Sequence, residues 1–97
     1  MRIAVISDIH ANLEAFHAVL HAIRTLAPDR ICCLGDIVGY NADPNACIDL
    51  VRDFGILSVL GNHDAVACGL EEPEDFNPWA RQAVLWTRRQ LTEANRA

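Results

Sequence analysis

Three short segments of the chain each combine polar side chains of the kinds that bind a metal ion or transfer a proton. They are Ser7-Asp8-Ile9-His10, Gly35-Asp36-Ile37-Val38-Gly39-Tyr40 and Gly61-Asn62-His63-Asp64. Three carboxylates brought together would repel one another, so a divalent cation is the natural counter-charge for them. Mixed carboxylate, imidazole and amide ligands suit Mn²⁺, Fe or Zn²⁺ better than Ca²⁺, which prefers oxygen ligands alone. The residue types therefore predict a transition-metal site.

Each polar segment directly follows a short apolar run that predicts a β-strand. The predicted strands are Arg2–Ser7, Arg30–Leu34 and Leu57–Leu60, of which the last has the weakest pattern. Their near-continuous apolarity favours parallel strands that are covered on both faces. Because ligands of parallel sheets bind at the carboxyl ends of the strands, we expect the three polar segments to meet there.

Helical patterns separate the predicted strands. The first helix follows Asn12 as its cap and has apolar residues three and four positions apart. A second helix is predicted over Asn45–Phe54, with Asp43 as its cap, and a third begins at Pro78. Residues 65–76 read as a solvated linker. This order predicts the α/β class and a small doubly wound, mostly parallel sheet with exposed edge strands, which indicates part of a larger domain.

Composition narrows the classes of function. The chain has 97 residues, with 8 Lys and Arg against 13 Asp and Glu, so its net charge is −5. That charge argues against a basic surface for nucleic acid or anionic lipid. No apolar run is long enough to span a bilayer, and Asp8 comes too early for a signal-peptide core, so we expect the cytoplasm. The four cysteines form no Cys-x-x-Cys pair and are expected to be reduced thiols.

Taken in order, the three motifs resemble the first three motifs of the calcineurin-like metallophosphoesterases. Asp8-x-His10, Gly35-Asp36-x-x-Gly39 and Gly61-Asn62-His63-Asp64 carry the resemblance, and the stretch from Phe76-Asn77-Pro78 onward is similar to a bacterial phosphodiesterase branch. The resemblance covers residues 1–97, but only the N-terminal part of the family domain. It implies the β-α-β-α-β-α portion of the family's αββα sandwich.

The resemblance implies a site with two divalent metal ions. Asp8 and His10 would bind the first ion, Asp36 would bridge the two ions, and Asn62 would bind the second. Mn²⁺ is the expected metal, with Fe, Zn²⁺ or Ni²⁺ as alternatives.

The resemblance also implies the reaction. A metal-bound hydroxide would attack the phosphorus of a phosphomonoester or phosphodiester, with a small phosphate ester or a nucleotide as the substrate. His63 would protonate the leaving oxygen or contact the phosphoryl group, and Asp64 would support His63 or the local loop.

One departure from the family pattern leaves alternatives open. The family completes its site with later histidines, including a Gly-His-x-His motif, and no histidine follows His63 here. The chain could therefore be a non-catalytic fragment or interaction module that keeps a partial metal site and pairs through its exposed sheet edge. A third alternative is a two-chain enzyme in which His17 or His21 of a second copy completes the site.

Overall fold

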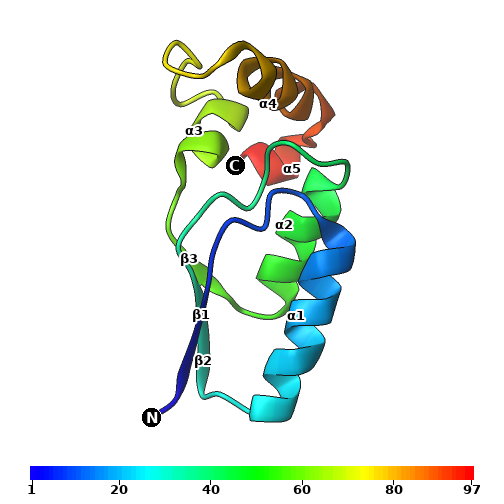
Figure 1. Cartoon of the computed structure of the whole chain (residues 1–97), viewed down its shortest axis with the longest axis vertical. Coiled ribbons are helices and arrows are strands. Elements are labelled where there is room, and N and C mark those ends of the chain that lie inside the picture. The colour runs from blue at the N-terminus through cyan, green and yellow to red at the C-terminus, as the bar shows by residue number, and fades with distance from the viewer.

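The computed structural model describes all of residues 1–97, which form three strands and five helices. Strands β1 (Ile3–Ile6), β2 (Arg30–Cys33) and β3 (Leu57–Ser58) make one parallel sheet in the order β1-β2-β3. The strands run in one direction, so their carboxyl ends lie at the same edge of the sheet (Figure 1). The predicted α/β class and parallel sheet are confirmed.

Two crossover helices pack on one face of the sheet. Helix α1 (Leu13–Leu26) joins β1 to β2, and α2 (Pro44–Asp53) joins β2 to β3, both on the same side in Figure 1. The core of this layer consists of six buried residues, namely Phe16, Leu20, Cys33, Cys47, Val51 and Ile56. Full burial of one large apolar side chain contributes roughly 1.5–3 kcal/mol, so this cluster is what holds the helices on the sheet.

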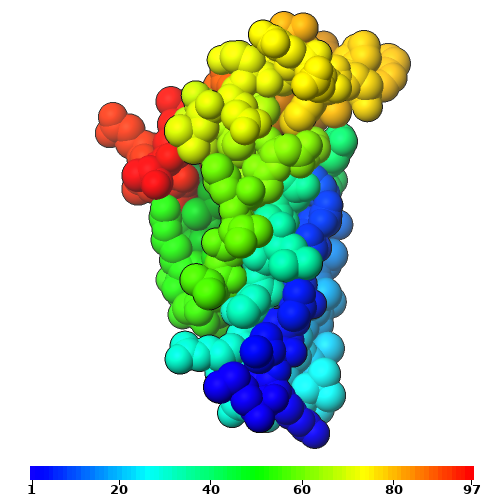
Figure 2. All heavy atoms as spheres, turned by 90° about the vertical axis from the view of Figure 1, so that its left-hand side faces the viewer, coloured from blue at the N-terminus to red at the C-terminus, as the bar shows by residue number.

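The other face of the sheet is uncovered within these 97 residues, and Figure 2 looks toward this side of the molecule. Five apolar side chains of this region are more than half exposed, namely Ile3, Val5, Leu34, Leu57 and Val59. Right-handed crossovers between strands that follow one another in the order β1-β2-β3 place successive helices on the same side. The expectations of a doubly wound arrangement and of strands covered on both faces are therefore wrong for this chain.

The remaining helices gather beyond the carboxyl ends of the strands (Figure 1). They are α3 (Asn62–Ala67), α4 (Pro78–Gln90) and α5 (Glu93–Arg96). A second core lies among them and consists of Val38, Val66, Ala67, Val84 and Leu91. The Arg88 guanidinium of α4 donates hydrogen bonds to the carbonyl oxygens of Val66 and Glu71, which ties α4 to the end of α3 and the segment after it.

Two predictions for this region are wrong. Residues 62–64 open a helix instead of lying in a loop, and residues 65–67 are buried instead of starting a solvated linker. The helix begins there because the Asp64 side chain accepts the backbone N–H of Gly61, three residues earlier, which satisfies one free donor of the first turn. Strand β3 is also shorter than predicted and ends at Ser58 instead of Leu60.

Candidate metal centre

The loops that follow β1 and β2 run side by side and are joined by backbone hydrogen bonds. The N–H of Asp8 donates to the carbonyl of Gly35 at 3.0 Å, and the N–H of His10 donates to the carbonyl of Asp36 at 2.9 Å. These bonds bring the first two polar motifs together at the carboxyl edge of the sheet.

The backbone of these loops is strained at several residues that have side chains. Positive φ angles between 48° and 65° occur at Asp8, His10, Ala11, Asp36 and Tyr40. A left-handed conformation costs such residues on the order of 1–3 kcal/mol each and persists only where the surrounding structure enforces it. Outside these two loops, the only other non-glycine residue with a positive φ is Ala27, at the end of α1. The strain is therefore concentrated where the polar motifs meet.

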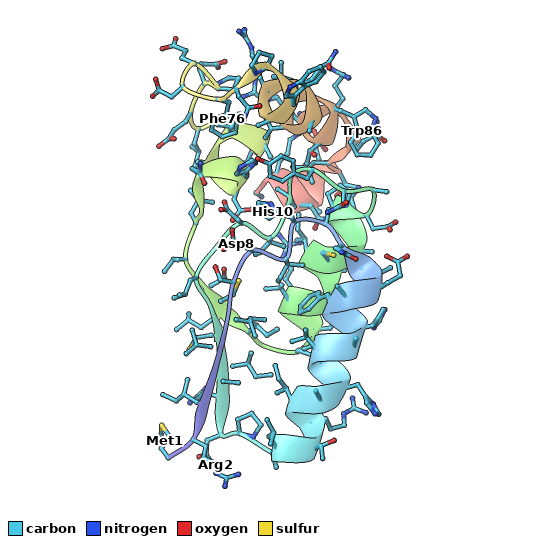
Figure 3. The ribbon with its side chains drawn as sticks, in the orientation of Figure 1. Met1, Arg2, Asp8, His10, Phe76 and Trp86 are labelled. Carbon is cyan, nitrogen blue, oxygen red and sulfur yellow. The ribbon has the colours of Figure 1, made fainter.

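Three of the predicted metal ligands lie together in this structure. Asp8, His10 and Asp36 each offer one carboxylate or imidazole atom, and these atoms all lie within 4.8 Å of one another. Figure 3 shows Asp8 and His10 side by side beyond the end of the sheet. Asp8 is exposed and the other two residues are partly buried, so a small ligand can reach the cluster from solvent.

The hydrogen bonds of His10 show that this cluster fits a cation. Its Nδ1 lies 3.0 Å from the carbonyl oxygen of Val38, which can only accept, so Nδ1 carries the proton. In the neutral ring, Nε2 then presents a lone pair to the Asp8 carboxylate oxygen, which is 3.2 Å away. Two acceptors that face each other need a proton or a metal ion between them. A hydrogen bond from the Ser7 hydroxyl lowers the pKa of Asp8 and favours its ionised form.

Asp36 links this cluster to the third motif, whereas Asn62 is not placed within it. One carboxylate oxygen of Asp36 accepts the backbone N–H of His63 at 3.0 Å. Asn62 is exposed at the first position of α3, and no hydrogen bond joins its side chain to Asp8, His10 or Asp36. The role of Asn62 as a ligand therefore stays a prediction.

Asp64 holds the loops together. Its buried carboxylate accepts three backbone N–H groups, from Asp36 at 2.8 Å, from Gly61 at 3.0 Å and from Val38 at 3.1 Å. Burial raises the pKa of Asp64, and the three hydrogen bonds act against that rise. None of its hydrogen bonds reaches His63. Of the two predicted roles of Asp64, the structure supports the one at the local loop.

Two glycines allow the ends of β2 and β3 to approach closely. Gly35 has a φ of +103°, and a Cβ atom at this position would lie 2.7 Å from the backbone nitrogen of Gly61. A Cβ atom at Gly61 would in turn overlap the backbone and side chain of Asp36. Only glycine fits at these two positions while Asp36 keeps its place.

His63 is buried within a group of rings. Its imidazole centroid lies 4.9 Å from that of His10, 4.8 Å from that of Tyr40 and 4.7 Å from that of Phe76. The residue is only 7% exposed, and burial lowers the pKa of His63. Sequence reasoning missed the contact with Phe76, which belongs to the segment predicted to be a solvated linker. The only sequence signal for Phe76 was that it begins a stretch similar to the phosphodiesterase branch.

This arrangement of strand-end ligands agrees with the family comparison. The sequence profile of the calcineurin-like phosphoesterases matches residues 1–94. The chain belongs to this family. The resemblance drawn from the three motifs is thereby confirmed.

Individual relatives of the chain are considerably longer than it is. An uncharacterized protein of Methanocaldococcus jannaschii is 52% identical over 93 residues, and the chain spans 38% of its length. The crystal structure of a metallophosphoesterase from Sphaerobacter thermophilus is 46% identical with a TM-score of 0.77, and the match covers 99% of this chain and 39% of that one. A structure described as a candidate diadenosine tetraphosphatase is 28% identical with a TM-score of 0.64, covering 93% and 42% of the two chains.

The five helices of the chain have between 4 and 14 residues. None of them is both long enough and apolar enough to cross a lipid bilayer.

All four cysteines, Cys32, Cys33, Cys47 and Cys68, are free thiols, as the absence of paired spacing predicts.

Proposed function

We propose that this chain takes part in the metal-dependent hydrolysis of a phosphomonoester or phosphodiester. The observation that carries the proposal is the cluster of Asp8, His10 and Asp36, whose candidate ligand atoms all lie within 4.8 Å of one another. The net charge of −5 would repel a phosphate ester from these carboxylates unless a bound cation reversed the local charge. A divalent ion held by these three residues would attract the ester and lower the pKa of a water molecule that attacks phosphorus.

A second ion is part of the proposal. Asp36 follows the central strand, and its carboxylate has lone pairs beyond the one that accepts the His63 N–H, so Asp36 would be a ligand that both ions could share. Asn62 would complete the second position, because it directly precedes His63 in α3. Mn²⁺ is our first choice, with Fe, Zn²⁺ or Ni²⁺ as alternatives, since the donors combine carboxylate, imidazole and amide groups.

His63 is proposed to protonate the leaving oxygen. Its ring centroid lies 4.9 Å from that of His10, one of the proposed metal ligands, which supports this role. Its Nδ1 is enclosed without a hydrogen-bond partner, whereas Nε2 is not enclosed in this way. Nε2 is therefore the atom that would hold the proton and donate it to the ester.

The substrate class follows from the site and from one relative. A candidate diadenosine tetraphosphatase is among the similar structures, which supports a nucleotide or another small phosphate ester as the substrate. Tyr40 offers a half-exposed aromatic ring beside His10. Aromatic rings of this kind pack against bases and other flat groups.

The test combines metal binding with hydrolysis by the full chain. Calorimetry would measure Mn²⁺ binding, and bis(p-nitrophenyl) phosphate and p-nitrophenyl phosphate would serve as substrates. We expect Asp36→Asn to lose Mn²⁺ binding, and His63→Gln to keep Mn²⁺ but lose most turnover. Asp49→Asn, which changes an exposed carboxylate of α2, is the matched control and should alter neither. Unchanged Mn²⁺ affinity in Asp36→Asn would refute the site.

A non-catalytic metal-binding or interaction module is the second candidate. The observations that favour it are the single imidazole among the three clustered ligands and the uncovered apolar face of the sheet. Mn²⁺ binding without hydrolysis of either substrate would support this candidate. Activity that rises with the square of protein concentration, and falls in a His17→Gln or His21→Gln variant, would instead support a site completed by a second copy.

A further inference from the structure

We propose that Phe76 and Tyr40 are positioning residues that hold the imidazole of His63 by ring packing, in place of a hydrogen bond to its Nδ1. This inference rests on the proposed function, because it takes His63 as the proton donor. It extends that function by assigning roles to two residues that bind neither metal nor phosphate.

The first observation is the way in which the two histidines of the site are held. A working histidine is normally oriented by a hydrogen bond from the nitrogen that faces away from the reaction. His10 follows this rule, because its Nδ1 lies 3.0 Å from the carbonyl oxygen of Val38. The Nδ1 of His63 is buried and has no hydrogen-bond partner. Some other interaction must therefore fix its ring.

The second observation is the set of rings around His63. Phe76 and Tyr40 lie 4.7 Å and 4.8 Å from its centroid, tilted by 45° and 46°, and His10 meets it nearly edge-on at 4.9 Å. These separations fall in the range of roughly 4.5–7 Å in which aromatic rings attract each other. Tyr40 also contacts His10, so one ring touches both histidines.

The third observation is that the packing comes from independent elements. Tyr40 lies in the loop between β2 and α2, whereas Phe76 lies between α3 and α4 and is labelled beyond His10 in Figure 3. Phe76 directly precedes Asn77, whose side chain caps α4 by accepting the N–H of Ala80 at 2.9 Å. The start of α4 therefore fixes the backbone from which the Phe76 ring extends.

The backbone of Gly39 closes a further side of the His63 ring. A Cβ atom at Gly39 would lie 2.8 Å from Nδ1 and 3.2 Å from Cβ and Cγ of His63. With Gly39 against Nδ1 and the rings of Phe76 and Tyr40 around it, the imidazole has little room to rotate about its side-chain bonds. Loss of one ring would leave Nε2 free to move away from the position at which it meets a leaving oxygen.

Nuclear magnetic resonance of the full, metal-free chain tests the packing directly. In the unaltered protein we expect nuclear Overhauser contacts between the rings of Phe76 and His63, and His63 ring protons shifted upfield by their aromatic neighbours. Phe76→Leu should remove the contacts and return the shifts toward those of a free histidine, and Phe76→Tyr should restore them. Phe54→Leu changes a partly exposed ring at the end of α2 and is the matched control. Unchanged His63 signals in Phe76→Leu would overturn the proposal.

Kinetics of the Mn²⁺-loaded chain with bis(p-nitrophenyl) phosphate test the positioning role. Phe76→Leu should lower kcat by about tenfold to a hundredfold, the size expected for a misplaced catalytic group, with KM and Mn²⁺ content unchanged. Phe76→Tyr should recover kcat. If Phe76→Leu does not fold, Phe76→Met replaces it under the same criterion, because methionine fills a similar volume without an aromatic ring. Full kcat in the leucine variant overturns the positioning role. A chain that shows the expected His63 signals but hydrolyses nothing refutes the proposed function and leaves the ring packing supported.

Discussion

At the scale of single residues, the carboxylate of Asp64 connects three segments of backbone and makes no hydrogen bond to the side chains of Asp8, His10 or His63. Its two oxygens accept the N–H groups of Asp36, Gly61 and Val38. Asparagine at this position would keep the shape but would turn an amide N–H₂ toward at least one of these donors. The position of Asp36, a proposed metal ligand, therefore depends on a residue outside the cluster of candidate ligand atoms.

Asp64→Asn is expected to destabilise the chain by about 1–3 kcal/mol, because buried donors lose a charged acceptor. Urea unfolding measures the loss, and calorimetry should show weaker Mn²⁺ binding as Asp36 moves. Asp49→Asn removes the same charge from an exposed position of α2 and is the control, with no measurable loss. Equal stability of the two variants would show that the Asp64 hydrogen bonds contribute little.

Gly35→Ala tests the close approach of β2 and β3. The added Cβ atom would meet the backbone of Gly61 at 2.7 Å in addition to the strain of a positive φ. Gly55→Ala is the matched control, because Gly55 also has a positive φ, of +62°, but has no atom within 4 Å of an added Cβ. We expect about 1 kcal/mol of destabilisation for Gly55→Ala and a clearly larger loss for Gly35→Ala in the same unfolding assay. Similar losses of stability in the two variants would mean that the backbone at Gly61 can shift to accommodate the added Cβ atom.

At the scale of elements, α2 buries the Cys47 thiol against the sheet, which gives the chain a measurable dependence on pH. Burial, with smaller contributions from Asp43 and Glu14, raises the pKa of Cys47 from 9.0 to about 11. Between these two values the unfolded chain has released the thiol proton and the folded chain retains it. The free energy of unfolding should therefore fall as the pH rises through this range.

Reaction with a thiol reagent tests the burial of Cys47 on which this prediction depends. The chain used for this test has its two partly buried cysteines, Cys32 and Cys68, replaced by serine. Below pH 9.0 the folded double variant should react slowly, since Cys33 and Cys47 are buried and the Cys47 thiol is protonated, and it should react fully in denaturant. Fast reaction of Cys47 in the folded chain would contradict the burial on which its raised pKa depends.

The sequence predicts most elements correctly because their signals are local. The apolar stripe that contains Phe16 and Leu20 identifies α1, and Pro78 after Asn77 marks the start of α4. The pattern around Asn62 is different, because its helix is short and begins at a glycine. A hydrogen bond from Gly61 to Asp64 stabilises the first turn of this helix. The residues that form the bond are equally typical of an ordinary polar turn.

The candidate metal ligands can be predicted from the sequence, but the contacts and backbone conformations that position them and His63 cannot. Asp8, His10 and Asp36 follow strands of one parallel sheet, so topology alone brings them together. The contact of Phe76 with His63 depends on how α4 packs against α3, which no local pattern encodes. Left-handed backbone at Asp8 and Asp36 is likewise imposed by hydrogen bonds between the loops and not by residue type.

At the scale of the whole molecule, the bare face of the sheet gathers several exposed apolar side chains. Val5 and Leu57 lie in one row across the strands with Cys32 between them, and they are 60% and 75% exposed. Contiguous apolar surface of this kind promotes association. A second copy of the chain, or the further chain length that its relatives possess, would gain free energy by covering it.

Replacing both Val5 and Leu57 by threonine should reduce self-association and the binding of an apolar dye, while the strands keep residues suited to a sheet. Light scattering as a function of protein concentration measures the association. Val19→Thr, at an exposed position of α1 away from the sheet, is the control and should leave it unchanged. Association that is equal in all three proteins would locate the contact elsewhere.

The spacing of the strand-end carboxylates has a consequence for folding. Asp36 and Asp64 are 28 residues apart, and the same interval separates Asp8 from Asp36, so each lies one strand and one helix from the next. No local stretch of chain can bring the three carboxylates together, because the chain must fold back twice, through a helix and a strand each time. An ion that binds only the assembled arrangement would therefore stabilise the entire folded chain by mass action. Occupancy of the centre would then report on completed folding as much as on catalysis.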